Sequence, residues 1–355
     1  MGEARFDVEK FINTAQVGGI EQYQIDGGAG RGVRALCVNT GGGLRYRVLA
    51  DRGMDIDQAF FNEHSLAFLT FNGATAPSRA LDRGIEWLKG FPGGLLTSCG
   101  PFNIGGPCED AGEQVGLHGT HSNSPATIES VVQPDPRHGN DEMRIVGRVR
   151  YGKLFNPCVE LRRTITSRLG SNAIDVEDEF FNAGNMPVPH AWLLHINLGY
   201  PLADSGAEFC YNARVEPLAV GLAPKRFKDA AQYKKVPAPS ETWNGSNEAV
   251  AYLYPEPADK SGRTTVGLVN RKLGIGVAIR YSTKEFTRCV NWQHWGKQEY
   301  VTALEPSNGS VEGRAKDRKD GVLDQLKPGE RKHYRYQIQV AVGREQIERL
   351  RSLNR

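Results

Sequence analysis

Two side chains in the sequence are suited to transferring protons, a glutamate and a histidine. Glu305 lies in "VTALEPSNG", at the end of an apolar run in which the small residue Ala303 shares its strand face. His195 lies in "MPVPHAWLLHINLGYP". If residues 188–198 form a strand, His190 points to the opposite face, because the two histidines are five positions apart. A carboxylate and an imidazole on neighbouring strands can take a proton from one oxygen and give one to another, so the pair predicts acid–base chemistry.

Other polar residues allow two interpretations of the surrounding site. Asn197 lies two positions after the histidine of the pair, and two polar side chains on one face of an apolar strand predict a concave face reached by solvent. A second histidine group, His118 and His121 in "VGLHGTHSNSPA", could instead begin a metal site with Cys108 or Glu113. That alternative needs a loop, since a spacing of three places two strand residues on opposite faces.

The elements that must position these residues are strands. Short runs that alternate apolar and polar residues recur between Gly, Pro, Asn and Asp, for example "VRALCVNT", "MRIVGRVRYG", "AIDVEDEFFNAG" and "HYRYQIQVAVG". Little between them resembles a crossover helix, which excludes a doubly wound α/β sheet and favours a large antiparallel sandwich. Helices are expected over 7–15, 78–91 and 344–353, and 217–260 is expected to be a long surface excursion.

Composition limits the partners and the location of the chain. The 44 basic and 41 acidic residues nearly balance and form no concentrated basic stripe, which argues against a nucleic-acid surface. No apolar stretch approaches the ~20 residues that span a bilayer, and the N-terminus lacks the apolar block of a signal peptide. The six cysteines form no CxxC pair, so we expect buried free thiols and a cytoplasmic protein. We expect one domain over residues 1–355, and a homodimer is compatible with the sequence.

Three motifs resemble those of aldose 1-epimerases (galactose mutarotases). "LHG", "NAGNMPVPHAWLLHINLG" and "ALEP" occur in the order in which that family carries a substrate-binding histidine, an acid histidine and a base glutamate. The resemblance extends from about residue 32 to residue 342. "ADRGMDI", "WLKGFPGG" and "GGLLTSCG" look more like a branch of aldose-1-epimerase-like proteins whose substrate is unknown. "HINLGY" replaces the family's "HSYFNL", and Thr120 replaces the second glycine of its "LHGG", so the sugar stays undefined.

The resemblance implies an all-β super-sandwich of large antiparallel sheets, and it implies roles for individual residues. Glu305 would take the proton of the anomeric hydroxyl and His195 would protonate the ring oxygen, so that a sugar exchanges its anomers without a cofactor. The substrate-binding candidates are His118, Asn197, Trp292 and an arginine, either Arg52 or Arg83, with Arg79 as a substitute for the latter. A sugar isomerase or epimerase, with or without a metal, and a non-catalytic carbohydrate-binding protein are alternatives on the same scaffold.

This mechanism sets a geometric expectation. Each side chain would make a hydrogen bond of roughly 2.6–3.2 Å to an oxygen, and the two oxygens share one carbon, so the ends of Glu305 and His195 should lie on the order of 5–7 Å apart. Both should lie on one sheet face, with His190 on the other.

Overall fold

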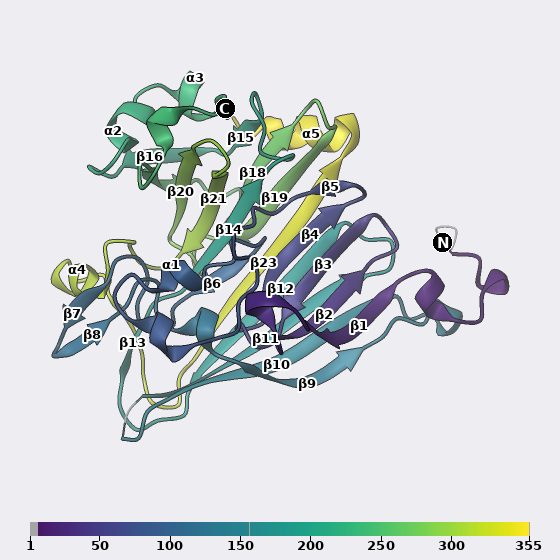
Figure 1. The fold of residues 1–355 in the computed structure, drawn as a ribbon, viewed down its shortest axis with the longest axis horizontal. Coiled ribbons are helices and arrows are strands. Elements are labelled where there is room, and N and C mark those ends of the chain that lie inside the picture. The colour runs from purple at the N-terminus through teal and green to yellow at the C-terminus, as the bar shows by residue number, and fades with distance from the viewer. Residues whose placement is uncertain (1–5, 156, 355) are drawn as a thin grey trace.

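A computed structural model describes residues 6–155 and 157–354. Strand makes up 45% and helix 14%, which confirms the prediction of an all-β protein. The strands form three large antiparallel sheets and two small ones. In Figure 1 the strands β20 and β21 lie to the upper left of the long central strand β23, and β1–β4 lie to its right. The five-stranded sheet has the order β1 (Gly19–Gln24), β2 (Arg34–Asn39), β3 (Leu44–Leu49), β4 (Asp55–Phe61) and β5 (His64–Ser65).

The other two large sheets contain the longest strands and the site. The eight-stranded sheet has the order β15 (Glu208–Cys210), β18 (Arg263–Asn270), β19 (Ile275–Ser282), β23 (Arg331–Val342), β12 (Ala173–Asn182), β11 (Cys158–Arg168), β10 (Glu142–Gly152) and β9 (Ala126–Val132). The six-stranded sheet has the order β16 (Ala213–Pro217), β17 (Ala249–Pro255), β20 (Arg288–Trp295), β21 (Tyr300–Ser307), β14 (Leu193–Gly199) and β6 (Thr97–Cys99). The small sheets pair β13 (Val188–His190) with β22 (Asp324–Leu326), and β7 (Cys108–Asp110) with β8 (Glu113–Val115).

The three large sheets share one hydrophobic core. Period-two alternation sends one side of each strand inward, as with Ile56 in β4, Leu161 in β11, Ile196 in β14 and Ile338 in β23, all at most 2% exposed. The six-stranded sheet therefore turns one face to this core. Its other face is available for a site.

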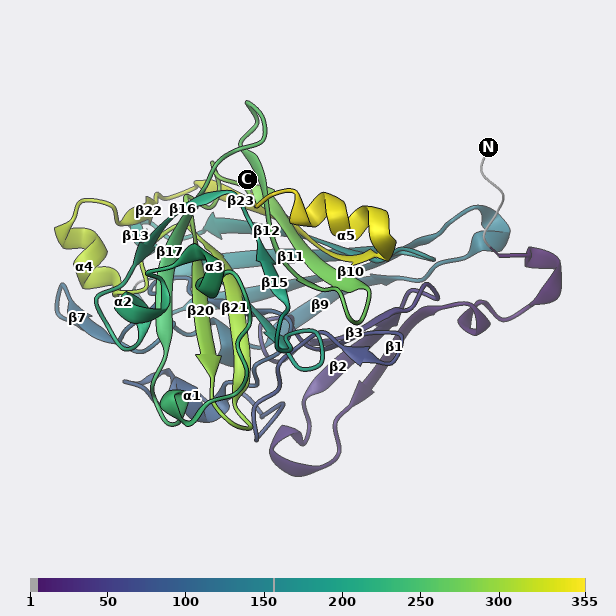
Figure 2. The same cartoon turned by 90° about the horizontal axis from the view of Figure 1, so that it is seen from above.

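Helices are short and lie outside the sheets. They are η1 (Val8–Lys10), η2 (Thr14–Gln16), η3 (Gly28–Gly30), η4 (Arg79–Asp82), α1 (Trp87–Gly90), η5 (His121–Asn123), η6 (Pro136–His138), α2 (Ala223–Arg226), α3 (Ala230–Tyr233), η7 (Glu241–Trp243), α4 (Arg314–Lys319) and α5 (Gly343–Arg351). The C-terminal helix was predicted correctly: Ile347 and Leu350 of α5 are each 5% exposed and pack on the outer side of the eight-stranded sheet (Figure 2).

The other helix predictions were only partly right. Residues 7–15 form two separate 3₁₀ turns, because Phe11 between them is extended and Asn13 caps the second turn. Residues 78–91 divide into η4 and α1, because Arg83 is extended and Gly84 has a positive φ of 49°. The prediction of a surface excursion over 217–260 is wrong for Ala249–Pro255, which form β17, an interior strand of the six-stranded sheet.

The structure contains no membrane-spanning helix candidate among the residues it describes.

Candidate functional site

Glu305 and His195 meet on the face of the six-stranded sheet that points away from the main core. The register pairs Leu193 with Ser307 and Ile196 with Leu304, which places His195 directly opposite Glu305. Glu305 also pairs with Val290, and His195 pairs with Thr97. The apolar residues on and above this face form a cluster of their own: Trp87, Phe91, Cys99, Ile104, Ala191, Leu193, Val250, Tyr252 and Val290.

The side chains of the pair touch. His195 Nε2 lies 3.4 Å from Glu305 Oε1, and the residues are 6% and 2% exposed. The expected shared face is therefore present, and His190 points away from it, toward Tyr334. The expected separation of 5–7 Å is wrong, because directly opposed residues of an antiparallel pair have their Cβ atoms only about 4.5–5.5 Å apart. Within the described chain Glu305 Oε1 makes no hydrogen bond, although it is buried.

Asn197 fixes the orientation and the tautomer of His195. Its amide nitrogen donates to the carbonyls of Gly93 (3.1 Å) and Gly94 (3.0 Å), so its Oδ1 must be the atom that faces His195 Nδ1 at 2.5 Å. His195 Nδ1 therefore carries a hydrogen and donates it, which leaves Nε2 free to exchange a proton with Glu305. Asn197 is fully buried, and its amide oxygen and nitrogen are hydrogen-bonded within the protein. It therefore orients His195, and these bonds leave its polar atoms less suited to the substrate binding that the sequence predicted.

Burial shifts the pKa values of His195 and Glu305 in opposite directions. Burial lowers the pKa of His195 to about 4, although the hydrogen bond to Asn197 raises it. Burial, and then the negative charge of Glu248, raise the pKa of Glu305 well above its ordinary value. Both directions favour the uncharged pair, with the proton on Glu305. Two titratable groups with displaced pKa values at one point are typical of a catalytic site.

Replacement of Asn197 tests the tautomer argument. Asn197→Ala should lower kcat by roughly 10- to 100-fold, the loss seen when other hydrogen bonds that orient an imidazole are removed. KM should change less, because Asn197 does not reach the substrate. Asn197→Asp keeps the acceptor for Nδ1 and removes the donors to Gly93 and Gly94. Recovery of kcat in the Asp variant supports the tautomer role, and equal loss in both variants would show that anchoring of the glycines matters instead.

Aromatic side chains and a second histidine enclose the pair. Phe91 and Trp292 lie with ring centroids 5.3 and 5.5 Å from His195, and His118 lies at 5.7 Å. Trp87 stacks on Phe91 at 4.6 Å and packs against His118 at 4.7 Å. The predicted site residues His118 and Trp292 are thus brought to the pair.

His118 is arranged as a neutral hydrogen-bond donor. Its Nδ1 accepts a hydrogen bond from the backbone N–H of Gly105 at 3.3 Å, so the remaining proton sits on Nε2. Burial, and then the nearby His195, lower its pKa to about 3, so the ring is uncharged at neutral pH. His118 can therefore donate to a ligand oxygen without supplying a proton to the reaction.

The sequence interpretation missed Glu248. Its Oε2 accepts a hydrogen bond of 2.6 Å from Trp292 Nε1, and its charge acts on Glu305. Glu248 stands directly before β17, within the segment that was expected to be a surface excursion. The apolar run "AVAYLY" that follows it was the available signal of a strand.

The predicted arginines do not reach the pair. Arg52 is 2% exposed, and its guanidinium donates to Gly90 O (2.7 Å), Asn123 Oδ1 (3.0 Å) and Thr75 Oγ1 (3.2 Å). It therefore braces the segment that carries Trp87 and Phe91. Arg83 and Arg79 are exposed.

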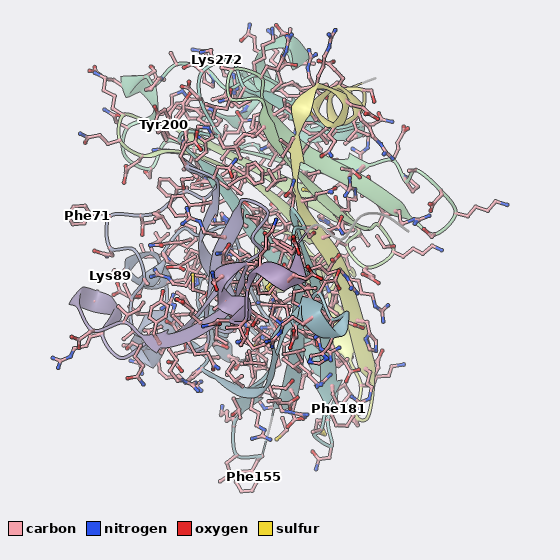
Figure 3. All side chains as sticks on the ribbon, turned by 90° about the vertical axis from the view of Figure 1, so that its right-hand side faces the viewer. Phe71, Lys89, Phe155, Phe181, Tyr200 and Lys272 are labelled. Atoms are coloured by element: carbon pink, nitrogen blue, oxygen red, sulfur yellow. The ribbon has the colours of Figure 1, made fainter. Side chains whose placement is uncertain are left out.

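The bonds of Arg52 matter because the segment with Trp87 and Phe91 covers the pair and also forms part of the protein surface. Its outer edge carries Phe71 and Lys89, which project from the body in Figure 3. Asn72, next to Phe71, donates a hydrogen bond from Nδ2 to the backbone carbonyl of Lys89. Only its inner side, with Trp87 and Phe91, is buried against the sheet.

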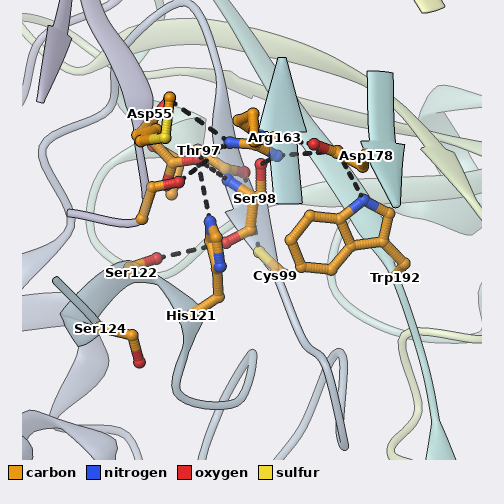
Figure 4. Close-up of polar contacts among 12 residues, drawn as sticks. Asp55, Thr97, Ser98, Cys99, His121, Ser122, Ser124, Arg163, Asp178 and Trp192 are labelled. Atoms are coloured by element: carbon orange, nitrogen blue, oxygen red, sulfur yellow. Dashed lines mark hydrogen bonds and ion pairs between the residues drawn. The ribbon is translucent and has the colours of Figure 1, made fainter. Parts of the chain in front are cut away.

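His121 belongs to a buried ionic network and not to the site (Figure 4). Its Nε2 lies 3.4 Å from Asp55 Oδ1, and its Nδ1 lies 2.5 Å from the hydroxyl of Tyr151. Arg163 joins Asp55 (3.0 Å) to Asp178 (2.6 and 2.9 Å) at the centre of the network. His118 and His121 thus face different environments, which removes the metal-site interpretation built on that pair. No group of three His, Cys, Asp and Glu side chains in the described part of the chain is arranged to hold a metal ion.

A separate hollow of about 490 Å³ lies on the eight-stranded sheet, away from the pair. Its charged side chains already have partners: Arg335 Nε donates to Glu177 (3.0 Å), and Arg280 donates to Gln337 (2.6 Å). It contains neither Glu305 nor His195, so the chemistry points to the six-stranded sheet. All six cysteines are free, but Cys158 is exposed and Cys37 and Cys108 are partly exposed, so only three match the expected buried thiols.

The sheets form a galactose mutarotase-like sandwich, the fold that the motifs predicted. A solved structure from Klebsiella pneumoniae, named as a candidate aldose 1-epimerase, matches with a TM-score of 0.81 and 22% identity over 96% of this chain and 89% of its own. A galactose mutarotase-like protein from Clostridium acetobutylicum matches with a TM-score of 0.63 and 13% identity, over 91% of this chain and 98% of its own. Galactose 1-epimerase from Lactobacillus acidophilus NCFM matches with a TM-score of 0.59 and 11% identity, over 92% of this chain and 99% of its own. At these identities the likeness shows the fold.

The family itself is shown by sequence. Residues 30–340 match the family described as Domain of unknown function (DUF4432), and the chain therefore belongs to that family. No curated protein matches the chain.

Proposed function

We propose that the protein is a carbohydrate mutarotase that interconverts the anomers of an aldose at Glu305 and His195. One observation carries the proposal: a buried carboxylate oxygen without a hydrogen bond faces an imidazole nitrogen whose tautomer is fixed, at 3.4 Å. Most buried polar groups are hydrogen-bonded, so an unpaired carboxylate oxygen beside an oriented imidazole supports a site that a ligand oxygen completes. The named activities of the structural neighbours agree with this chemistry.

The proton balance closes within the pair. Glu305 takes the proton of the anomeric hydroxyl while His195 Nε2 gives one to the ring oxygen, the bond from C1 to the ring oxygen breaks, and the open-chain aldehyde forms. Rotation about C1–C2 and the reverse transfers close the ring as the other anomer. This direction needs the ionic pair, which burial disfavours. A substrate hydroxyl that donates to Glu305 stabilises the carboxylate and offsets that effect.

The substrate must also reach the buried pair. His195 and Glu305 are 6% and 2% exposed, and the rings of Phe91 and Trp292 lie against His195, so we propose that side chains around the pair move aside when the sugar enters. Trp292, held by Glu248, supplies an apolar surface for one sugar face, and His118 donates to a hydroxyl.

Exchange NMR on the anomeric protons of a panel of reducing sugars tests the activity. We expect exchange between α and β signals to exceed the spontaneous rate for at least one sugar. Activity that is lost on chelation and restored by a divalent ion would favour a metal-assisted isomerase. Binding without any acceleration would favour a carbohydrate-binding protein.

His118→Ala should raise KM more than it lowers kcat. The donor binds a hydroxyl in both the ground state and the transition state, so its loss removes binding common to both. His118→Gln, which retains a donor, should recover part of the affinity. Steady-state kinetics on the preferred sugar measure both constants, and an abolished kcat with unchanged KM would show that His118 transfers a proton.

A further inference from the structure

Arg288 lies on the same sheet face as the acid–base pair. It begins β20, where the register pairs it with Ser307, two positions along from the pairing of Val290 with Glu305. Its guanidinium carbon lies 5.3 Å from the ring centroid of Tyr252 and 6.0 Å from that of Tyr254. Tyr252 belongs to the apolar cluster that surrounds the site, and Tyr254 packs against that cluster.

This arginine has no anionic partner. It is half-buried, its Nε is fully buried without a hydrogen bond, and it forms no ion pair with any residue that the structure describes. Arg214 gives the contrast: it stacks on the same Tyr254 at 4.0 Å, but it is bonded to Glu216 at 2.7 Å. A buried polar group without a partner is unfavourable, so the unpaired Nε of Arg288 points to a ligand that supplies the missing acceptor.

The two ends of the site differ in charge. Arg288 and Trp292 lie four residues apart on one face of β20, about 13 Å along the strand, and Glu248 is bonded to Trp292. Glu305 lies beside Val290, between these ends. A sugar with its anomeric carbon at Glu305 can therefore direct an acidic substituent toward Arg288 and its neutral hydroxyls toward Glu248.

We propose that the substrate is an anionic sugar, whose carboxylate, phosphate or sulfonate is bound by Arg288. The inference rests on the proposed mutarotation at Glu305 and His195 and names its substrate class. A guanidinium suits this task because its planar donors match the oxygens of such groups in pairs. Tyr252 and Tyr254 hold the guanidinium by cation–π contact without neutralising its charge.

Exchange NMR and calorimetric titration with matched sugars test the inference. Glucose and galactose are compared with their uronates and their 6-phosphates, which separates a carboxylate from a phosphate source. We expect the wild type to bind and interconvert at least one anionic sugar better than its neutral parent. Arg288→Gln should lower kcat/KM and affinity for that sugar by roughly tenfold or more, the effect of losing a charged hydrogen bond, and should leave the neutral parent unchanged.

Two matched variants control the result. Arg288→Lys keeps the charge and should restore part of the preference for the anionic sugar. Arg214→Gln removes the other arginine stacked on Tyr254 and should leave the preference intact. Loss of the preference in Arg214→Gln as well would show a general charge effect and overturn the assignment.

The two proposals fail separately. Mutarotation of neutral sugars, with no gain for any anionic member of the panel, would overturn the anionic substrate and leave the mutarotase. Binding of an anionic sugar that depends on Arg288, without acceleration of its anomer exchange, would support the site and overturn the mutarotase. A wild type that shows no Arg288-dependent preference by either method overturns the inference.

Discussion

Glu305→Gln is expected to lower kcat by roughly 10²- to 10⁴-fold, the usual contribution of general acid–base catalysis. The amide keeps the size of the carboxyl and its ability to hydrogen-bond, so sugar binding should survive. His195→Asn should have a similar effect. The double variant should lose less than the product of the two single losses, because the two groups act in the same step as a unit.

A matched variant guards against indirect effects. Glu299→Gln removes a carboxylate from the same hairpin of β20 and β21, but Glu299 is 72% exposed and should leave kcat unchanged. Exchange NMR under identical conditions compares the variants. A Glu305→Gln enzyme that retains kcat within twofold would rule out the carboxylate as the proton carrier.

The same substitution should stabilise the protein at high pH. The folded-state pKa of Glu305 lies above its ordinary value of 4.5, so the folded protein holds this proton more tightly than the unfolded chain. The stabilising contribution is complete below pH 4.5 and is lost as the pH rises through the folded-state pKa. Glutamine mimics the protonated form and avoids that loss. Denaturant unfolding should therefore show Glu305→Gln to be more stable than the wild type at pH 8 and equally stable near pH 4.

Arg163→Leu is expected to destabilise the protein by about 3–5 kcal/mol, the loss typical of breaking a buried ion pair on one side. Arg163 and Asp178 are fully buried, and Asp55 is 3% exposed. Removal of the guanidinium takes two hydrogen bonds from Asp178 and one from Asp55, and it breaks the 2.8 Å bond to Ser98 Oγ in β6. Denaturant unfolding at pH 7 measures the change.

The control lies on the same strand. Arg168 of β11 pairs with Asp141 at 2.6 Å, but the two side chains are 57% and 51% exposed, so Arg168→Leu should lose about 1 kcal/mol or less. Comparable losses in both variants would show that leucine disturbs β11 itself. A loss below about 1 kcal/mol for Arg163→Leu would contradict the role given to the network.

The sequence by itself predicted most of the strands, their faces and a shared face for Glu305 and His195. Alternation is a local property, so it placed Glu305 with Ala303 and separated His190 from His195 before any pairing was known. It also located α5, because Ile347 and Leu350 follow helical spacing within one short segment. Local patterns failed where a strand follows a long irregular segment, as with β17 after residue 248.

Only the tertiary structure decided what each polar atom touches. The 3.4 Å contact of His195 with Glu305 follows from the register of two strands that are more than a hundred residues apart in the chain. Asn197 orients His195 because its amide nitrogen donates to the carbonyls of Gly93 and Gly94, which turns its amide oxygen toward His195 Nδ1. Hydrogen-bond partners are chosen by competition among groups that only folding brings together. No local spacing could therefore have shown that the terminal nitrogens of Arg52 are hydrogen-bonded, or that Arg288 has no ion pair among the described residues.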